Sequence, residues 1–276
     1  MIPIMIQVMI NTVQIHSNTT IARAVLKEKL AGRSTLERGK ERTMTALEWI
    51  YRWGWASSST IEILVGTQRS GLAQRLMKSG LLVSTKTLSR RNEKFLPGSF
   101  LTLTPDGKHM VEVIRMELLP YEFRPDRVNQ NHLLHDEMAQ RITAERLASG
   151  AIKGYRTEKE MRDKSQNAIK NPDAVWIHSD GTKQSIEIEL SGKWERDLDV
   201  FVHSSLLSLS TKDGPARFDR LLIITDAPAI FKRYQEVLLP GEKFWTWQKN
   251  ESGRWTTVEQ KTVPTWAKER ISWELI

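Results

Sequence analysis

The chain has 276 residues, of which 39% are hydrophobic, and this composition supports folded cores and excludes a disordered chain. It contains no cysteine, which excludes disulfides and thiolate metal sites and leaves carboxylates, histidines, lysines and hydroxyls to carry any chemistry. The net charge of +8 is concentrated before residue 129, because residues 1–128 hold 19 Lys and Arg against 11 Asp and Glu. Such an excess is typical of a surface that binds phosphates.

Residues 1–42 form an N-terminal arm in this interpretation. The arm starts with an apolar run of ten residues that lacks a preceding basic region and a small-residue cleavage site, so we expect no signal peptide. No stretch approaches the roughly 20 apolar residues that span a bilayer, so we expect a soluble, cytoplasmic protein without a membrane segment. The pattern leaves the role of the arm open between packing on the next domain, pairing in a dimer and contacting a nucleic-acid backbone.

Three short helices and a β-hairpin are predicted over residues 43–118. Apolar residues at helical spacing place the first helix from Thr43, the second after a run of serines at residues 57–59, and the third over residues 68–78. Gly80 ends the third helix. Two apolar strands, beginning near Leu81 and Phe100, then flank a polar tip at residues 90–94.

This order of elements resembles that of winged helix-turn-helix DNA-binding domains. The resemblance implies that polar residues of the third helix face the major groove, while basic residues at the hairpin tip approach phosphates or the minor groove. The residues concerned are Arg69, Gln74 and Arg75 on the helix, and Arg90, Arg91 and Lys94 at the tip. A dimerising or purely structural role is the alternative for this domain.

Residues 119–131 are polar and contain Pro125, so we expect them to link the first domain to a second one over residues 132–276. The second domain is predicted to start with a helix from His132 to about Leu147. A hairpin at residues 173–190, a helix at 197–210, a buried strand at 220–226, a helix at 228–238 and a terminal hairpin at 244–258 follow. The predicted fold class is α/β, or α+β for the chain as a whole.

The strongest chemical signal lies in the hairpin. Ile186 and Ile188 alternate with Glu187 and Glu189, which predicts a strand that directs both glutamates to one face. Asp173 opens the preceding strand, and the turn around residue 181 brings all three acids to one edge of the sheet. Because clustered carboxylates repel one another, we expect Mg²⁺ or Mn²⁺ to be bound by the three acids. The alternative is an amphipathic hairpin whose outward face carries glutamates.

This hairpin resembles the core of PD-(D/E)xK nucleases, with Asp173 in the Pro-Asp position and Glu187 as the second acid. Where the family usually has a lysine, this chain has Glu189, and Lys193 lies four residues further on. The resemblance implies that Glu189 adds charge or a water contact and that Lys193 stabilises negative charge in the reaction. It also implies a further acid from the first core helix. Glu137 matches that position, with Glu145 and Glu158 as rivals.

Taken together, residues 43–240 resemble the replication-relaxation family, and in particular the MobC-type relaxases of mobilizable plasmids. The resemblance implies a protein that binds double-stranded DNA at a plasmid transfer origin, nicks one strand with a bound metal ion, and works with an accessory mobilization or coupling protein. The sequence lacks a histidine triplet, which disfavours a conventional tyrosine relaxase. The alternatives are a non-catalytic DNA-binding regulator or replication accessory protein, and a restriction-type double-strand endonuclease.

Overall fold

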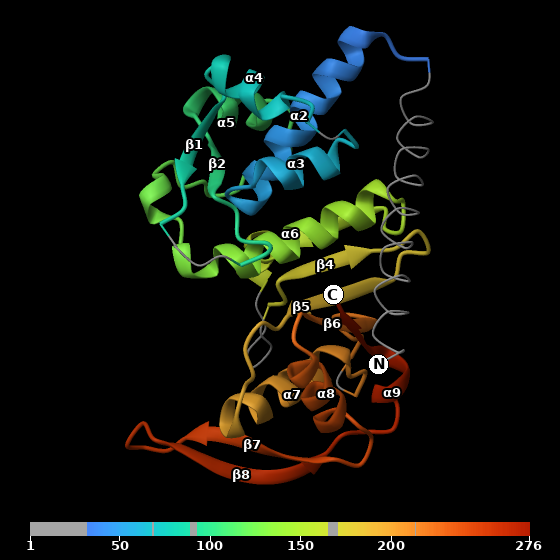
Figure 1. Ribbon diagram of the computed structural model, residues 1–276. Coiled ribbons are helices and arrows are strands. Elements are labelled where there is room, and N and C mark those ends of the chain that lie inside the picture. Colours follow the sequence, from blue (N-terminus) through green and yellow to red (C-terminus); the bar gives the residue numbers. More distant parts are fainter. Residues whose placement is uncertain (1–31, 68, 89–92, 165–170, 213) are drawn as a thin grey trace, which may run out of the picture. The chain divides into compact units, whose positions relative to one another are not determined.

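A computed structural model describes residues 32–276 apart from 68, 89–92, 165–170 and 213 (Figure 1). The chain divides into two compact units, the first ending at Lys153 and the second running from Gly154 to Ile276. The boundary therefore lies beyond residues 119–131, where the sequence pattern predicted a linker. The arm at residues 1–42 is described only from residue 32, and Arg90 and Arg91 lie outside the described residues.

The first unit contains helices and one small antiparallel sheet. Strand β1 pairs with β2, and the register joins Leu82 to Leu103. The elements are α2 (Thr35–Trp53), α3 (Ser58–Leu64), α4 (Leu72–Lys78), β1 (Leu82–Lys86), β2 (Ser99–Leu103), α5 (Pro105–Glu112), two short 3₁₀ turns at Pro125–Arg127 and Gln130–His132, and α6 (Leu133–Ala148). The predicted order of three helices and a hairpin is present, but the first helix begins eight residues earlier than expected.

Local signals in the sequence explain where these helices start and stop. Ser34 and Glu37 form a capping box at the start of α2, so the backbone amides that lack helical partners are satisfied by side chains. The helix ends at Gly54, which adopts a left-handed φ of 94°. Ser57 caps α3 by accepting a hydrogen bond from the amide of Thr60.

Helix α6 is part of the first unit, although the sequence pattern predicted that it would open the second domain. It packs on α3, and the indole of Trp49 on α2 donates a 2.8 Å hydrogen bond to the side chain of Gln140. Leu133, Met138 and Ala139 are buried. Because the helix buries apolar side chains and a polar pair within the first unit, that unit extends beyond the predicted linker.

The second unit is built on a five-stranded mixed sheet with the strand order β3-β4-β5-β6-β9. Strands β3, β4 and β5 are antiparallel neighbours, whereas β6 runs parallel to β5 and β9 runs parallel to β6. The elements are β3 (Gly154–Thr157), a 3₁₀ helix (Glu158–Lys164), β4 (Ala174–Ile177), β5 (Lys183–Ile188), α7 (Glu195–Leu209), β6 (Arg220–Thr225), α8 (Pro228–Val237), β7 (Lys243–Lys249), β8 (Trp255–Thr262), α9 (Ala267–Arg270) and β9 (Ile271–Leu275).

Helix α7 connects two parallel strands, β5 and β6, and therefore crosses one face of the sheet (Figure 1). Phe201 and Val202 of α7 pack with Leu221 and Ile223 of β6 in one apolar core, which also includes Tyr234 of α8. Strands β7 and β8 form a separate two-stranded ribbon, as the pattern at residues 244–258 predicted. The expectation of a mixed α/β protein is confirmed.

One strand, β9, had no counterpart among the predicted elements. It adds to the edge of the sheet beside β6, and the register pairs Ile223 with Trp273. A five-residue strand near the end of the chain has little periodicity of its own, and its place depends on pairing with a distant segment. Among the helices that the structure describes, none has the length and apolarity needed to cross a membrane.

Candidate functional site

Asp173 immediately precedes β4 and lies against the end of β5. Its backbone amide donates to the carbonyl of Ile186 at 3.1 Å, and its carboxylate accepts a 2.7 Å hydrogen bond from the amide of Ile188. Both contacts involve the two residues that flank Glu187. The predicted hairpin is therefore formed, and it brings Asp173 to the segment of β5 that carries Glu187.

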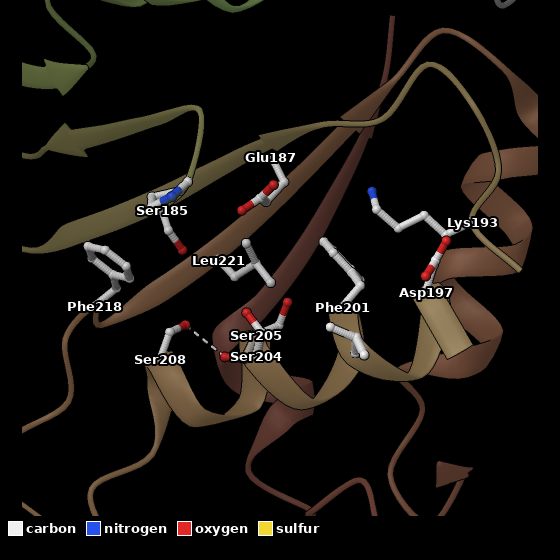
Figure 2. A pocket seen from close by; sticks show the side chains of 12 residues that line it. Ser185, Glu187, Lys193, Asp197, Phe201, Ser204, Ser205, Ser208, Phe218 and Leu221 are labelled. Carbon is white, nitrogen blue, oxygen red and sulfur yellow. Dashed lines mark hydrogen bonds between the residues drawn. The ribbon is translucent and has the colours of Figure 1, made fainter. Parts of the chain in front are cut away.

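Glu187 is buried, with 6% of its surface exposed, and it lines a pocket of about 200 Å³ between the sheet and α7. The register places Ser185 opposite Leu221 and Glu187 opposite Ile223, so both polar residues face the side of the sheet that α7 covers. Figure 2 shows the Glu187 carboxylate pointing from the strand toward that helix. A carboxylate in such a pocket has access to a small ligand while the apolar walls limit its contact with water.

The helical wall of this pocket is made by a polar stripe on α7. Asp197, Phe201, Ser204, Ser205 and Ser208 line the pocket, and their spacing of three or four residues places them on one face of the helix (Figure 2). The Ser208 hydroxyl donates to the Ser205 carbonyl at 2.7 Å. The sequence pattern predicted the helix but not this stripe. Its signal was present in the periodicity, since serines recur on a face that would otherwise be apolar.

Glu189 lies one residue beyond the end of β5 and is the centre of a second polar cluster. Its carboxylate forms an ion pair with Lys193 and accepts a 2.9 Å hydrogen bond from the hydroxyl of Tyr234. Only 4% of Glu189 is exposed. Burial, reinforced by the charge of Glu189, raises the pKa of the Tyr234 hydroxyl, so Tyr234 stays protonated and acts as a donor.

Lys193, four residues beyond Glu189, is half-buried. Besides pairing with Glu189, it lines the pocket that contains Glu187, and its ammonium lies 4.9 Å from the centre of the Phe201 ring. A lysine held between a carboxylate and two aromatic rings has a restricted position. Lys193 and Glu187 therefore line the same pocket, while the ammonium of Lys193 is paired with Glu189.

The three acids do not form the single metal-binding group that the sequence pattern predicted. Within the described part of the chain, no group of three or more Asp, Glu and His side chains is arranged to hold a metal ion. Glu189 follows the last residue of β5, and its two oxygens are engaged by Lys193 and Tyr234. Asp173 and Glu187 remain, and two carboxylates fit Mg²⁺, which usually keeps several waters and binds one or two carboxylates.

Glu137 belongs to the first unit and not to this site. One carboxylate oxygen accepts hydrogen bonds from the hydroxyls of Ser57 and Thr60, at 2.5 and 2.8 Å, while the other is buried and has no hydrogen-bond partner in the described part of the chain. Burial raises the pKa of this carboxyl despite the hydroxyl donors. The prediction that Glu137 supplies an acid to the nuclease-like core is therefore replaced by a contact between α6 and the start of α3.

The two rival acids are not among the residues that line the pocket either. Glu158 begins the 3₁₀ helix after β3, is exposed, and is not among the residues that line the pocket. Glu145 is exposed on α6 in the first unit and pairs with Arg141 at 3.2 Å. The described pocket thus has Glu187 and Asp197 as its acidic residues.

The predicted DNA-contacting residues of the first unit that the structure describes are on its surface. Gln74 and Arg75 are exposed on α4, and Arg75 donates a 2.8 Å hydrogen bond to the carbonyl of Ser70. Arg69 is exposed in the turn before α4 and has a left-handed φ of 52°. Lys94, near the hairpin tip, is exposed with its ammonium 4.8 Å from the centre of the Phe95 ring.

Comparison of the chain with family models, with curated proteins and with solved structures gives no match in any of the three.

Proposed function

We propose that the chain is a DNA-binding protein that makes a single-strand nick with a divalent cation, Mg²⁺ or Mn²⁺. The observation that carries the proposal is the position of Asp173, whose backbone and carboxylate are hydrogen-bonded to the residues on either side of Glu187. Lys193 lines the pocket that contains Glu187. Two carboxylates and an ammonium are the residue types that metal-dependent phosphodiester cleavage requires.

The strand order of the second unit supports this proposal. The acids lie on an antiparallel hairpin, β4 and β5, which is followed by the crossover helix α7 and the parallel strand β6. The PD-(D/E)xK resemblance implies this same order. Because α7 covers the face to which Glu187 points, the fold produces a pocket that Glu187 lines (Figure 2).

Each residue of the site would have a separate role in the reaction. Asp173 and Glu187 would hold the cation, which when bound would polarise the scissile phosphate and lower the pKa of a water molecule. Lys193 would stabilise the negative charge that develops on the phosphate. Glu189 and Tyr234 would act as positioning residues, because together they hold the ammonium of Lys193 in the pocket wall.

The first unit would supply recognition of the DNA. Its three helices followed by a hairpin agree with the winged helix-turn-helix interpretation, and α4 presents Gln74 and Arg75 to solvent. The excess of basic residues before residue 129 suits phosphate contacts. Within this proposal the substrate is double-stranded DNA at a plasmid transfer origin, and an accessory mobilization or coupling protein is the expected protein partner.

The test is a nicking assay on a supercoiled plasmid that carries the DNA flanking the gene, with Mg²⁺ or with EDTA. We expect Asp173→Asn and Glu187→Gln each to lower the nicking rate by at least ~10²-fold, a reduction of the size typical for a catalytic group, while DNA affinity stays within a few fold of the parent. Asp180→Asn is the matched control, because Asp180 is an exposed acid in the turn of the same hairpin. Metal-dependent nicking that persists in the double variant would refute the assignment.

A non-catalytic DNA-binding regulator is the second candidate function. It is favoured by the environment of Glu189, whose two oxygens are engaged by Lys193 and Tyr234 and which the family pattern expects near the metal. In this case the parent protein binds DNA but does not nick it with either cation. The same assay therefore decides between the two candidates, since only a nicking parent supports the first.

A further inference from the structure

The first unit contains a hollow of about 820 Å³ between the first half of α2, helix α4 and α5. Its charged lining consists of Arg38, Lys40 and Arg42 from α2 and Arg75 from α4. Leu36 and Met110, both exposed, add an apolar surface to the wall. The hollow is more than large enough for a single phosphate group and its sugar.

No acidic side chain lines this hollow in the part of the chain that the structure describes. The two glutamates on the same stretch of α2 have other partners: Glu37 completes the capping box with Ser34, and Glu41 forms an ion pair with Arg33. The four basic residues of the lining make no ion pair with a described residue. Four cations around one hollow repel one another, and an anion bound between them would remove that repulsion.

One of the four basic residues has an unsatisfied donor. The Nε atom of Arg42 is buried and finds no hydrogen-bond partner among the described residues. Buried donors are normally satisfied, and this nitrogen has no acceptor in the part of the chain that the structure describes. Phosphate oxygens are the acceptors that guanidinium groups bind most readily.

The position of the hollow indicates which phosphates of a bound DNA would reach it. Arg75 lines the hollow and is the direct neighbour of Gln74 on α4, the helix that we propose to face the major groove. A helix in the major groove has a phosphate backbone on either side of it. Arg38 and Arg42 are one helical turn apart, about 6 Å along the axis of α2, so these two side chains follow a line along the helix.

We propose that this hollow binds the sugar-phosphate backbone of the DNA duplex whose major groove α4 contacts, with Arg38, Lys40 and Arg42 as its phosphate ligands beside Arg75. This inference rests on the proposed DNA-binding function and extends it. The binding surface then begins within residues 35–42, which the sequence pattern assigned to an arm and not to the DNA-binding domain. The ligand is recognised by charge and shape, so these contacts strengthen binding to every sequence.

The test measures how the affinity of the full-length chain for a fluorescently labelled, mixed-sequence duplex depends on NaCl between about 50 and 200 mM. Each lost phosphate contact lowers the slope of log affinity against log salt by about 0.9. We therefore expect the double variant Arg38→Gln, Lys40→Gln to lower the slope by nearly 2 and to weaken binding at least ~10-fold. The charge-keeping variant Arg38→Lys, Lys40→Arg should retain the parental slope.

The matched control is Arg124→Gln, Arg127→Gln, which removes the same charge from exposed residues of the same unit that do not line the hollow. A control that keeps the parental slope supports the inference. If the parent binds and Gln74→Ala weakens binding, but the Arg38, Lys40 variant behaves like the control, the inference is overturned while the proposed function stands. A parent that binds no duplex overturns both.

Discussion

Glu137 allows the sharpest test of the structure, because the sequence pattern assigned it to catalysis and the structure gives it a role in packing. Glu137 is 2% exposed, and its carboxyl group ties α6 to α3 through the hydroxyls of Ser57 and Thr60. The second oxygen is buried and has no hydrogen-bond partner among the described residues. We expect Glu137→Ala to destabilise the contact by about 2–4 kcal/mol, since it leaves two buried hydroxyls without an acceptor and opens a small cavity.

Glu137→Gln should behave differently from the alanine variant. The amide keeps an oxygen for the two hydroxyl donors but carries no charge to desolvate. The sign of the pH effect follows from the raised pKa of Glu137 in the folded state. The folded protein retains the proton longer than the unfolded chain, so parental stability declines as the pH rises from about 4.5 toward the folded pKa. The glutamine variant lacks this decline and is at least as stable as the parent at pH 8.

Hydrogen exchange of the full-length protein measures the local stability of the contact between α3 and α6. The quantities to compare are the protection factors of peptides from these two helices at several pH values. Glu145→Gln is the control, because Glu145 is an exposed glutamate on the same helix, and we expect it to change stability by less than ~0.5 kcal/mol. A glutamine variant as unstable as the alanine variant, together with parental protection that is independent of pH, would contradict the reasoning. Loss of nicking with unchanged protection would restore the catalytic assignment.

Two further predictions concern packing. Tyr234→Phe keeps the edge-to-face contact with Phe201 but removes the donor to Glu189. We therefore expect the free energy of unfolding, measured in urea, to fall by about 1.5–3 kcal/mol. An unchanged free energy would show that the hydroxyl contributes nothing. Gly107→Ala should cost about 1–3 kcal/mol, because a Cβ atom there would lie 2.2 Å from the carbonyl oxygen of Leu81. Gly39→Ala on α2 should not destabilise, because a Cβ atom there would meet no atom of the described residues within 4 Å. Equal effects of the two substitutions would be inconsistent with the close approach at Gly107.

The hairpin that carries the acids could be predicted from the sequence because its signals are local. Alternation of isoleucine with glutamate depends on the period of a strand, and the turn at Gly181, where φ is 90°, depends on the conformational freedom of one residue. The same is true of the serine cap of α3 and the glycine that ends α2. These features involve residues a few positions apart, so the sequence by itself determines them.

The partners of the buried acids depend on contacts between distant segments. Whether Glu189 joins Glu187 or pairs with Tyr234 depends on where β5 ends and where α8 packs, 45 residues further along the chain. Glu137 is bound by residues about 80 positions earlier. Local periodicity contains no information about such neighbours, because the free energy that selects them comes from burial and hydrogen bonding across the assembled core. The sequence therefore determined which residues could act, and only the tertiary structure decided which of them meet.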